Sequence, residues 1–155
     1  MTATVPPPES LRGLSLAIPV RFAECDSYCV VWHGHYALYL EHVREALTGR
    51  FGFTAASSLA MGYKVPITRM ELKYRAPAMA DQVIRVTARL RPPNVARFVM
   101  DYEIRSESGN LLASAVTEQV VLNAQGELLL TLPSGLRALC ASILEYQDIL
   151  DRAAP

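Results

Sequence analysis

The chain has 155 residues, with 15 lysine and arginine residues against 15 aspartate and glutamate residues, so its formal net charge is zero. This length allows one domain with a substantial core. A neutral balance argues against nucleic acid or an anionic membrane as the main partner, because both favour a basic excess. No apolar run approaches the roughly 18 residues that a membrane-spanning helix needs.

The composition of the N-terminus and the number of cysteines indicate the cellular compartment. Residues 1–12 are expected to form a flexible tail, because they are rich in proline and lack the basic and apolar regions of a secretory signal. Residues 13–150 are expected to form a single domain. The three cysteines, Cys25, Cys29 and Cys140, have no disulfide-scaffold density, which is typical of a reducing compartment. We therefore expect a cytoplasmic protein.

The first predicted elements are a strand and a long helix. Apolar residues alternate from Leu14 to Phe22, which predicts a half-buried strand, and Pro19 indicates an edge or a bulge. The next turn carries Asp26, and an amphipathic helix begins near residues 33–35 and ends near residues 49–52. The residues at helical spacing that should face the core are Tyr36, Leu40, Val43 and Leu47.

A short helix, four strands and a last helix follow. Residues 53–64 predict a short helix that stops at Gly62. Apolar alternation predicts strands at residues 65–75, 84–91, 96–105 and 111–122, with a bulge near Thr68 and a hairpin at residues 92–94. Ser134 is a reasonable N-cap for the last helix. A largely antiparallel sheet can bury the apolar stripe of the long helix by wrapping around it.

The turn and the helix start carry a motif. It reads Asp26-Ser-Tyr-Cys-Val-Val-Trp-His-Gly-His-Tyr36, with Glu41 and Arg44 in register on the helix. This stretch resembles the hotdog-fold acyl-CoA thioesterases of the 4-hydroxybenzoyl-CoA thioesterase / YbgC-like family, and the resemblance covers roughly residues 14–145. It implies an α+β hotdog fold, an antiparallel sheet wrapped around one long central helix. It also implies a homodimer or homotetramer with sites across subunit contacts.

The resemblance implies catalytic roles for Asp26 and His33. Asp26 would attack the thioester carbonyl or activate a water, and the backbone N–H of His33 would polarise the carbonyl oxygen. Unpaired N–H groups and the positive end of the dipole make a helix start a suitable oxyanion site. The sequence does not separate nucleophile from general base, since both need the same carboxylate. The simpler interpretation of Asp26 is a turn or capping aspartate.

One position departs from the family pattern. Cys29 stands where the family has glycine. If that glycine takes a positive φ, cysteine needs strain or a different turn, which affects where Asp26 points.

Several residues are candidates for binding the substrate. Trp32, Tyr36 and Tyr39 would line an aromatic acyl pocket, although aromatic residues at this spacing are more often core. Glu41 would border the acyl pocket or act as a second carboxylate, or else form an ion pair on the helix surface. Arg91 and Arg97 flank the proline hairpin and would bind the phosphates of CoA, although solvated strand arginines are the commoner case.

The turn and the helix start also carry a cluster of metal-ligating residue types. Cys25, Cys29, His33 and His35 fall within one turn and a helix start. Such crowding leaves little room for a tetrahedral site, so we expect no metal and no cofactor.

The sequence therefore predicts an acyl-CoA thioesterase that hydrolyses an aromatic or medium-chain acyl thioester to free acid and CoA. Three alternatives remain: a hotdog hydratase or dehydratase, a thioesterase for acyl-carrier-protein thioesters, and a non-catalytic acyl-CoA-binding module. A hydratase releases no thiol from acyl-CoA, and a binding module shows saturable binding without turnover.

Overall fold

The computed structural model of the protein describes residues 10–153. In chain order, its helices and strands are β1 (Leu14–Pro19), α1 (Tyr36–Gly49), α2 (Ala55–Ala60), β2 (Ile67–Tyr74), β3 (Val83–Leu90), β4 (Arg97–Ser106), β5 (Leu111–Val120) and α3 (Ser134–Ala153). Short 3-10 helices occupy Phe22–Glu24 and His33–His35. Most of the expected tail at residues 1–12 lies outside the described residues.

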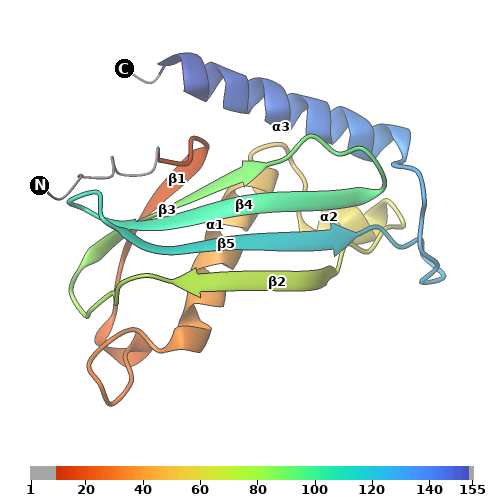
Figure 1. Ribbon diagram of the computed structural model, residues 1–155. Helices are drawn as coiled ribbons and strands as arrows, with labels where there is room; N and C mark the ends of the chain where they lie inside the picture. Colours follow the sequence, from red (N-terminus) through yellow and green to blue (C-terminus); the bar gives the residue numbers. More distant parts are fainter. Residues whose placement is uncertain (1–9, 154–155) are drawn as a thin grey trace, which may run out of the picture.

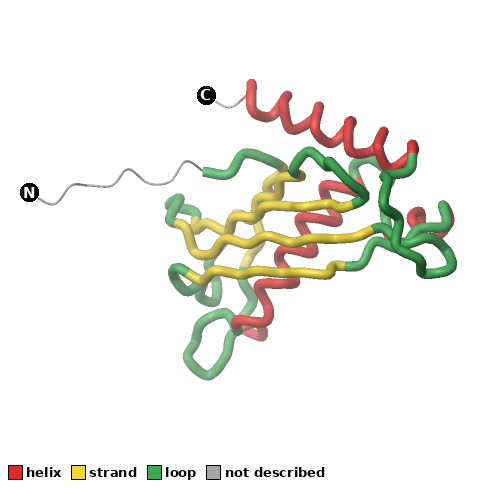
Figure 2. The backbone as a smooth tube through the Cα atoms, turned by 45° about the vertical axis from the view of Figure 1, so that its right-hand side comes forward, coloured by secondary structure: helices red, strands yellow, loops and turns green. Residues whose placement is uncertain are grey.

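The five strands form one antiparallel sheet in the order β1-β3-β4-β5-β2. The long helix α1 lies behind this sheet in Figure 1 and crosses its strands, and Figure 2 shows the same relation from a second direction. One sheet packed on one long helix is the arrangement that the hotdog resemblance implies. The α+β prediction is therefore confirmed.

The core lies between α1 and the sheet. The predicted stripe of α1 is buried in full, and the third residue after Tyr36, Tyr39, is buried with it. The strands present alternate residues to the helix, because successive side chains of a strand point to opposite faces. On β3 and β4 the buried residues of this set are Ile84, Val86, Ala88, Leu90, Phe98, Met100, Tyr102 and Ile104.

The last helix, α3, is attached to the sheet through Gln147, which is 1% exposed. The backbone N–H of Leu90 donates to Oε1 of Gln147 at 2.7 Å, and Nε2 of Gln147 donates to the Leu90 carbonyl at 3.0 Å. β1 begins at Leu14, opposite Ala88. The Gln147 amide therefore takes the place of a strand neighbour just beyond the end of β1.

The first strand is shorter than predicted. β1 ends at Pro19, and Phe22 lies in a 3-10 helix with 82% of its surface exposed, so the extension of the strand to Phe22 is wrong. The backbone N–H of Arg21 donates to the Glu24 carboxylate at 3.0 Å, and the Glu24 N–H donates back to the Arg21 carbonyl at 3.0 Å. These two hydrogen bonds turn the chain, which apolar alternation alone did not indicate. The edge position of Pro19 is confirmed.

Two local predictions further along the chain are also confirmed. The register of β2 against β5 shifts between Ile67 and Arg69, which places a bulge at Thr68. The short helix α2 ends before Gly62, whose φ of 80° is readily adopted by glycine.

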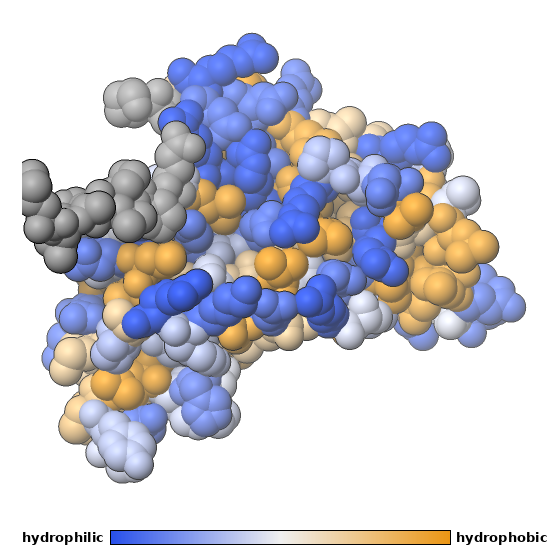
Figure 3. Space-filling view, in the orientation of Figure 1, coloured by the Kyte–Doolittle hydropathy of each residue, from blue (hydrophilic) through white to orange (hydrophobic). Residues whose placement is uncertain are grey.

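The face of the sheet turned away from α1 is polar. Arg69 pairs with Glu71 and Glu118, each at 2.8 Å, and Arg91 pairs with Asp101 at 2.6 Å. Figure 3 views this face and shows hydrophilic side chains in a band across its middle. Within residues 10–153, no helix combines the length and the hydropathy needed to cross a membrane.

Candidate active site

Asp26 lies in a narrow loop that doubles back before α1. The backbone N–H of Asp26 donates to the Val30 carbonyl at 2.9 Å, and the Cys29 N–H donates to the Asp26 carbonyl at 2.9 Å. One residue further from the tip of the loop, Cys25 and Val31 form an antiparallel bridge. The returning arm of this loop leads directly into the helix start, so the fold brings Asp26 and that helix start into the same region.

Cys29 closes the tip of this loop with a φ of 61°. The position therefore has the positive φ that the family's glycine suggested, and cysteine occupies it. A residue with a Cβ pays roughly 1–2 kcal/mol in the left-handed region. The loop keeps its turn because the Cys29 N–H and the Asp26 N–H both find carbonyl acceptors inside it.

The two carboxylate oxygens of Asp26 have different surroundings. Oδ1 accepts a hydrogen bond from the Tyr28 N–H at 2.8 Å, the local turn contact that the simpler interpretation predicts. For Oδ2, residues 10–153 provide no donor. One oxygen thus orients the carboxylate, and the other has no hydrogen-bond donor among residues 10–153. The turn role and a catalytic role are compatible in this geometry.

The helix start offers unpaired backbone donors. His33–His35 forms a 3-10 helix that continues into α1, and the His35 N–H donates to the Trp32 carbonyl at 2.8 Å. The N–H groups of His33 and Gly34 have no acceptor within the described part of the chain. The Tyr74 hydroxyl donates to the His33 carbonyl at 2.8 Å and so holds this peptide in place. Such donors at the positive end of a helix suit a developing oxyanion.

Trp32 covers the helix start, with 51% of its surface exposed. Its indole lies so close to Gly34 that a Cβ at that position would come within 2.4 Å of the ring. Gly34 is therefore required by the close approach of the indole. The expected substrate-contacting residue Trp32 thus flanks the unpaired N–H groups.

A polar network that the sequence analysis missed lies beneath the loop. The Tyr39 hydroxyl donates to Oε2 of Glu24 at 2.6 Å, Nε2 of His35 lies 3.4 Å from Oε1, and the Trp32 N–H donates to the Glu24 carbonyl at 2.9 Å. Burial, reinforced by the neighbouring Glu24 carboxylate, raises the pKa of Tyr39. Burial alone would raise the pKa of Glu24, but the hydrogen bonds from Tyr39 and the Arg21 N–H outweigh it and lower that pKa.

This network ties the loop to α1 through residues far apart in the sequence. The position of Glu24, two residues before Asp26, was the only feature of the sequence that could have drawn attention to this network. The partner of Glu24, Tyr39, lies on the buried side of the helix. Hydrophobic spacing marks Tyr39 as core and does not reveal which carboxylate meets its hydroxyl.

The predicted acyl-contacting residues occupy different environments. Tyr36 is 3% exposed, its hydroxyl accepts a hydrogen bond from the Ala78 N–H at 3.2 Å, and its ring packs edge-on against Tyr74. Tyr36 thus lies in the core beneath the helix start, and its contact with an acyl group stays a prediction. Glu41 forms the predicted ion pair with Arg44 and also lines a cavity.

Arg91 and Arg97 are not brought together with Asp26 and His33. Arg91 makes two hydrogen bonds to Asp101, at 2.7 and 2.6 Å, on the face of the sheet away from α1. Hydrogen bonding to Asp101 raises the pKa of Arg91. Arg97 lies 3.4 Å from Glu118 on the same face. The binding of CoA by these two arginines stays a prediction.

The cysteines and histidines near the loop do not assemble into a metal site. Within residues 10–153, no group of three or more histidine, cysteine, aspartate or glutamate side chains lies close enough to hold a metal ion.

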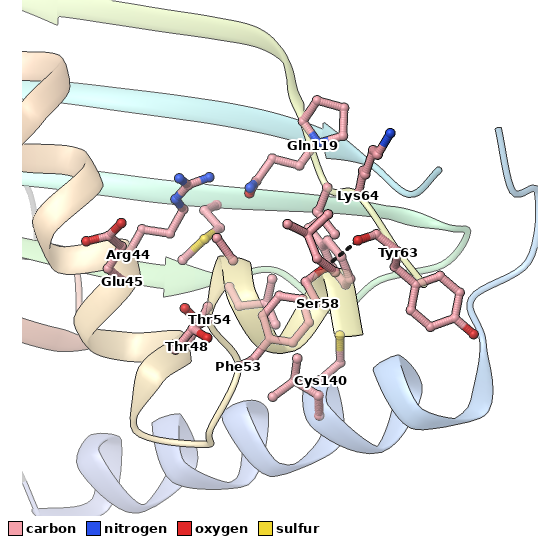
Figure 4. A pocket seen from close by; sticks show the side chains of 18 of the residues that line it. Arg44, Glu45, Thr48, Phe53, Thr54, Ser58, Tyr63, Lys64, Gln119 and Cys140 are labelled. Carbon is pink, nitrogen blue, oxygen red and sulfur yellow. Dashed lines mark hydrogen bonds between the residues drawn. The ribbon is translucent and has the colours of Figure 1, made fainter. Parts of the chain in front are cut away.

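A cavity of about 800 Å³ opens at the other end of α1. Its walls come from the second half of α1, from α2 and the loop after it, from β3, β4 and β5, and from α3 (Figure 4). Glu41, Arg44 and Thr48 line it along α1, whereas Asp26 and His33 do not contribute to its walls. The sequence predicted Glu41 either at the border of an acyl pocket or in a surface ion pair, and it did not indicate the other walls of this cavity, which come from distant parts of the chain.

Comparisons with known sequences identify relatives. A family model described as the Thioesterase-like superfamily matches residues 20–140. YneP from Bacillus subtilis (strain 168), named for acyl-CoA thioesterase activity, is 25% identical over 108 residues, 70% of this chain and 78% of the relative. A 1,4-dihydroxy-2-naphthoyl-CoA hydrolase from Thermosynechococcus vestitus is 24% identical over 120 residues, 77% of this chain and 82% of the relative.

Comparisons with solved structures find similar folds. The hypothetical protein TT1821 from Thermus thermophilus superposes with a TM-score of 0.74 and 29% identity, covering 83% of this chain and 98% of its own. A DHNA-CoA thioesterase from Staphylococcus aureus superposes with a TM-score of 0.76 and 22% identity, covering 87% and 93%, and this likeness concerns the fold alone. Because the family model spans most of the chain, the protein belongs to the thioesterase-like superfamily and has its hotdog fold.

Proposed function

We propose that this member of the thioesterase-like superfamily is an acyl-CoA thioesterase that hydrolyses an aromatic or medium-chain acyl thioester to free acid and CoA. The observation that carries the proposal is the pair of unpaired N–H groups of His33 and Gly34 at the helix start, which directly follows the returning arm of the loop that bears Asp26. Thioester hydrolysis needs an oxygen nucleophile and donors for the oxyanion. The residues near the start of α1 supply both groups.

In the proposed reaction, the His33 N–H donates to the carbonyl oxygen, and the Gly34 N–H is available beside it. In one route, Asp26 forms a C–O bond to the acyl carbon, the C–S bond breaks and the thiolate takes a proton. Water then cleaves the resulting anhydride and restores the carboxylate. In the other route, Asp26 takes a proton from water as the water oxygen attacks, and the thiolate leaves and is protonated. Both routes release the same acid and thiol.

The Glu24 network supports this chemistry by positioning. The Glu24 carboxylate accepts a hydrogen bond from the Tyr39 hydroxyl of α1, and the Glu24 backbone carbonyl accepts one from the backbone N–H of Trp32. Glu24 therefore links the chain just before Asp26 to the helix that carries the donors. Fixed donors are worth more than mobile ones, because they need no reorganisation as charge develops.

We further propose a homodimer or homotetramer. β2 is an edge strand whose outer hydrogen-bonding groups face no other strand of the sheet. Among residues 10–153, nothing covers this edge fully, and apolar side chains on it are exposed: Ile67 at 36%, Met70 at 38% and Tyr74 at 49%. An open edge with exposed apolar residues favours pairing with a second copy. Light scattering should give at least twice the mass of one chain, and a monomeric mass for the active protein would contradict this proposal.

The proposal for CoA assigns its phosphates to Arg91 and Arg97. Each arginine already pairs with a carboxylate, Asp101 or Glu118, so a phosphate must replace that partner or share the guanidinium. Replacing both arginines with glutamate should raise KM for acyl-CoA, because the phosphates would then meet like charge. An unchanged KM would leave both arginines as surface residues.

The first experiment is a thiol-release assay across butanoyl-, octanoyl-, dodecanoyl- and benzoyl-CoA, with an acyl-carrier-protein thioester beside them. Thiol release that requires Asp26 supports the proposal. Conversion of unsaturated acyl-CoA without thiol release would indicate a hydratase. Saturable binding without turnover would indicate a binding module, and release from the carrier-protein thioester alone would change the substrate class.

A further inference from the structure

We propose that the cavity at the C-terminal half of α1 receives the distal part of an uncharged aliphatic acyl chain of about dodecanoyl length, with α2 and α3 forming its far walls. This inference rests on the proposed thioester hydrolysis and names the acyl class that it serves. It selects aliphatic chains over the compact aromatic groups that the sequence left equally open. The cavity volume of about 800 Å³ lies within the range of roughly 300–1,000 Å³ that small-molecule sites occupy.

The cavity-lining residues of α1 lie on the same side of the helix as the proposed oxyanion donors. Gly34, Ala37, Glu41, Arg44 and Thr48 follow one another at intervals of three and four residues, so they form one stripe along the helix. The donors of the proposed oxyanion site lie at the beginning of this stripe, and the last three residues line the cavity. A chain held at the helix start can therefore follow one helix face into the cavity.

The distance along the helix sets the chain length. A rise of about 1.5 Å per residue places Glu41 about 12 Å beyond His33. A butanoyl group spans less than about 5 Å at about 1.5 Å per C–C bond, so it ends before the cavity. A dodecanoyl group spans roughly 14 Å when extended, because a zigzag chain advances only about 1.3 Å along its axis per bond, and it enters the cavity. The cavity should therefore discriminate long chains from short ones.

Polar side chains gather at the end of the cavity nearer the helix start. Arg44 of α1 and Gln119 of β5 point toward one another across the part of the cavity nearer the helix start (Figure 4). Gln119 is 6% exposed, and no hydrogen bond of its side-chain amide is found within residues 10–153. No fully buried side-chain nitrogen or oxygen in these residues lacks a partner, so the amide of Gln119 is accessible from the cavity that it lines and is available to a ligand or water. Polar groups at one end of an apolar cavity are typical of a small-molecule site.

The far part of the cavity is apolar, and its charges balance. Phe53 and Leu59 come from the α2 side, Phe98 and Met100 from β4, and Cys140 and Ile143 from α3. Figure 4 shows Cys140 on α3 directed toward α2 across this space. The acidic lining residues, Glu41 and Glu45, are matched by two basic ones, Arg44 and Lys64. A lining without net charge favours a neutral chain over one that ends in a carboxylate.

Two substitutions test the assignment from opposite walls. Ala56→Trp adds an indole at an exposed alanine of α2 that lines the cavity, and Ala60→Trp is its matched control, because Ala60 is an exposed alanine of the same helix outside the lining. Cys140→Phe fills the cavity from α3. The measured quantity is the ratio of kcat/KM for dodecanoyl-CoA to that for butanoyl-CoA.

We expect this ratio to exceed ten in the unmodified protein and to fall by about tenfold or more in Ala56→Trp and in Cys140→Phe, because filled space excludes chain methylenes. Ala60→Trp should leave the ratio unchanged. An unchanged ratio in Ala56→Trp would overturn the proposal while the thioesterase assignment stands. Ala56 is exposed, so this variant decides the question even when Cys140→Phe fails to fold.

A binding measurement separates this proposal from the reaction. Equilibrium dialysis with labelled dodecanoic acid should show saturable binding that Ala56→Trp weakens about tenfold and Ala60→Trp does not. This result supports the cavity assignment even when no acyl-CoA yields free thiol, an outcome that would remove the thioesterase proposal alone. Absence of saturable dodecanoic acid binding, together with a flat chain-length profile, would overturn the cavity assignment.

Discussion

The two ends of α1 are built on different physical principles. At the N-terminal end, hydrogen bonds of 2.6 to 3.0 Å hold Glu24, Tyr39 and the loop around Asp26, and a glycine lets an indole lie against the backbone. At the C-terminal end, apolar side chains from three directions leave about 800 Å³ unfilled. Reactive groups need fixed positions, whereas a binding chamber needs space. The same helix has both kinds of surroundings because its faces and ends meet different neighbours.

The largest effect should come from the proposed reactive end. Asp26→Asn keeps the turn contact to the Tyr28 N–H but removes the anionic oxygen, so kcat should fall by about 10³-fold, about 4 kcal/mol in the activation barrier. Steady-state thiol release measures the change, and thermal unfolding should show the fold intact. The control is Asp81→Asn, an exposed turn aspartate with a φ of 66°. A loss of less than tenfold at Asp26 would remove its carboxylate from the mechanism.

The next largest effect should be on the free energy of unfolding, where α3 is attached to the end of β3 near the cavity. Gln147→Leu leaves the N–H and the carbonyl of Leu90 without their partners. Because a buried unpaired polar group costs about 1–3 kcal/mol, the free energy of unfolding should drop by about 2–4 kcal/mol. Urea denaturation measures this loss. The exposed loop residue Gln125 gives the control Gln125→Leu, which should change stability little. A drop below 1 kcal/mol at Gln147 would show that α3 is attached mainly by its apolar face.

A smaller effect should follow at the helix start. Gly34→Ala introduces a Cβ at 2.4 Å from the Trp32 ring, so either the indole or the first turn must shift. Displacement of the proposed donors should lower kcat by about tenfold to a hundredfold. Gly135→Ala is the matched control, since a Cβ there meets nothing within 4 Å. Equal activity in the two variants would mean that the position of the first turn does not limit the rate.

The smallest effect should concern strain in the loop. Cys29→Gly removes the cost of a φ of 61° for a residue with a Cβ, roughly 1–2 kcal/mol, but increases the entropy of the unfolded chain. The net gain should be about 0.5 kcal/mol in unfolding free energy. Cys25→Gly should instead lower the free energy of unfolding. Cys25 has a φ of −91°, so glycine relieves no strain there and only increases the entropy of the unfolded chain. Destabilisation by Cys29→Gly would indicate that the thiol itself stabilises the loop.

Local patterns were sufficient for much of the fold. Helical spacing identified the buried stripe of α1, because a helix that packs on a sheet must present apolar residues every three or four positions. Alternation identified β2 to β5, and the phase change at Ile67 located the bulge at Thr68. Phe22 was misplaced, because the Arg21–Glu24 turn interrupts an alternation that would otherwise continue.

The candidate site was predictable only where its residues are neighbours in the chain. Asp26, the glycine-like position of Cys29 and the helix start fall within one motif, so the sequence by itself determined that they share one region. The Glu24–Tyr39 hydrogen bond, the attachment of α3 through Gln147 and Leu90, and the cavity between α1, α2 and α3 were decided by the tertiary structure alone. Each of these depends on which distant side chains meet, and hydrophobic periodicity records which face is buried without specifying what that face contacts.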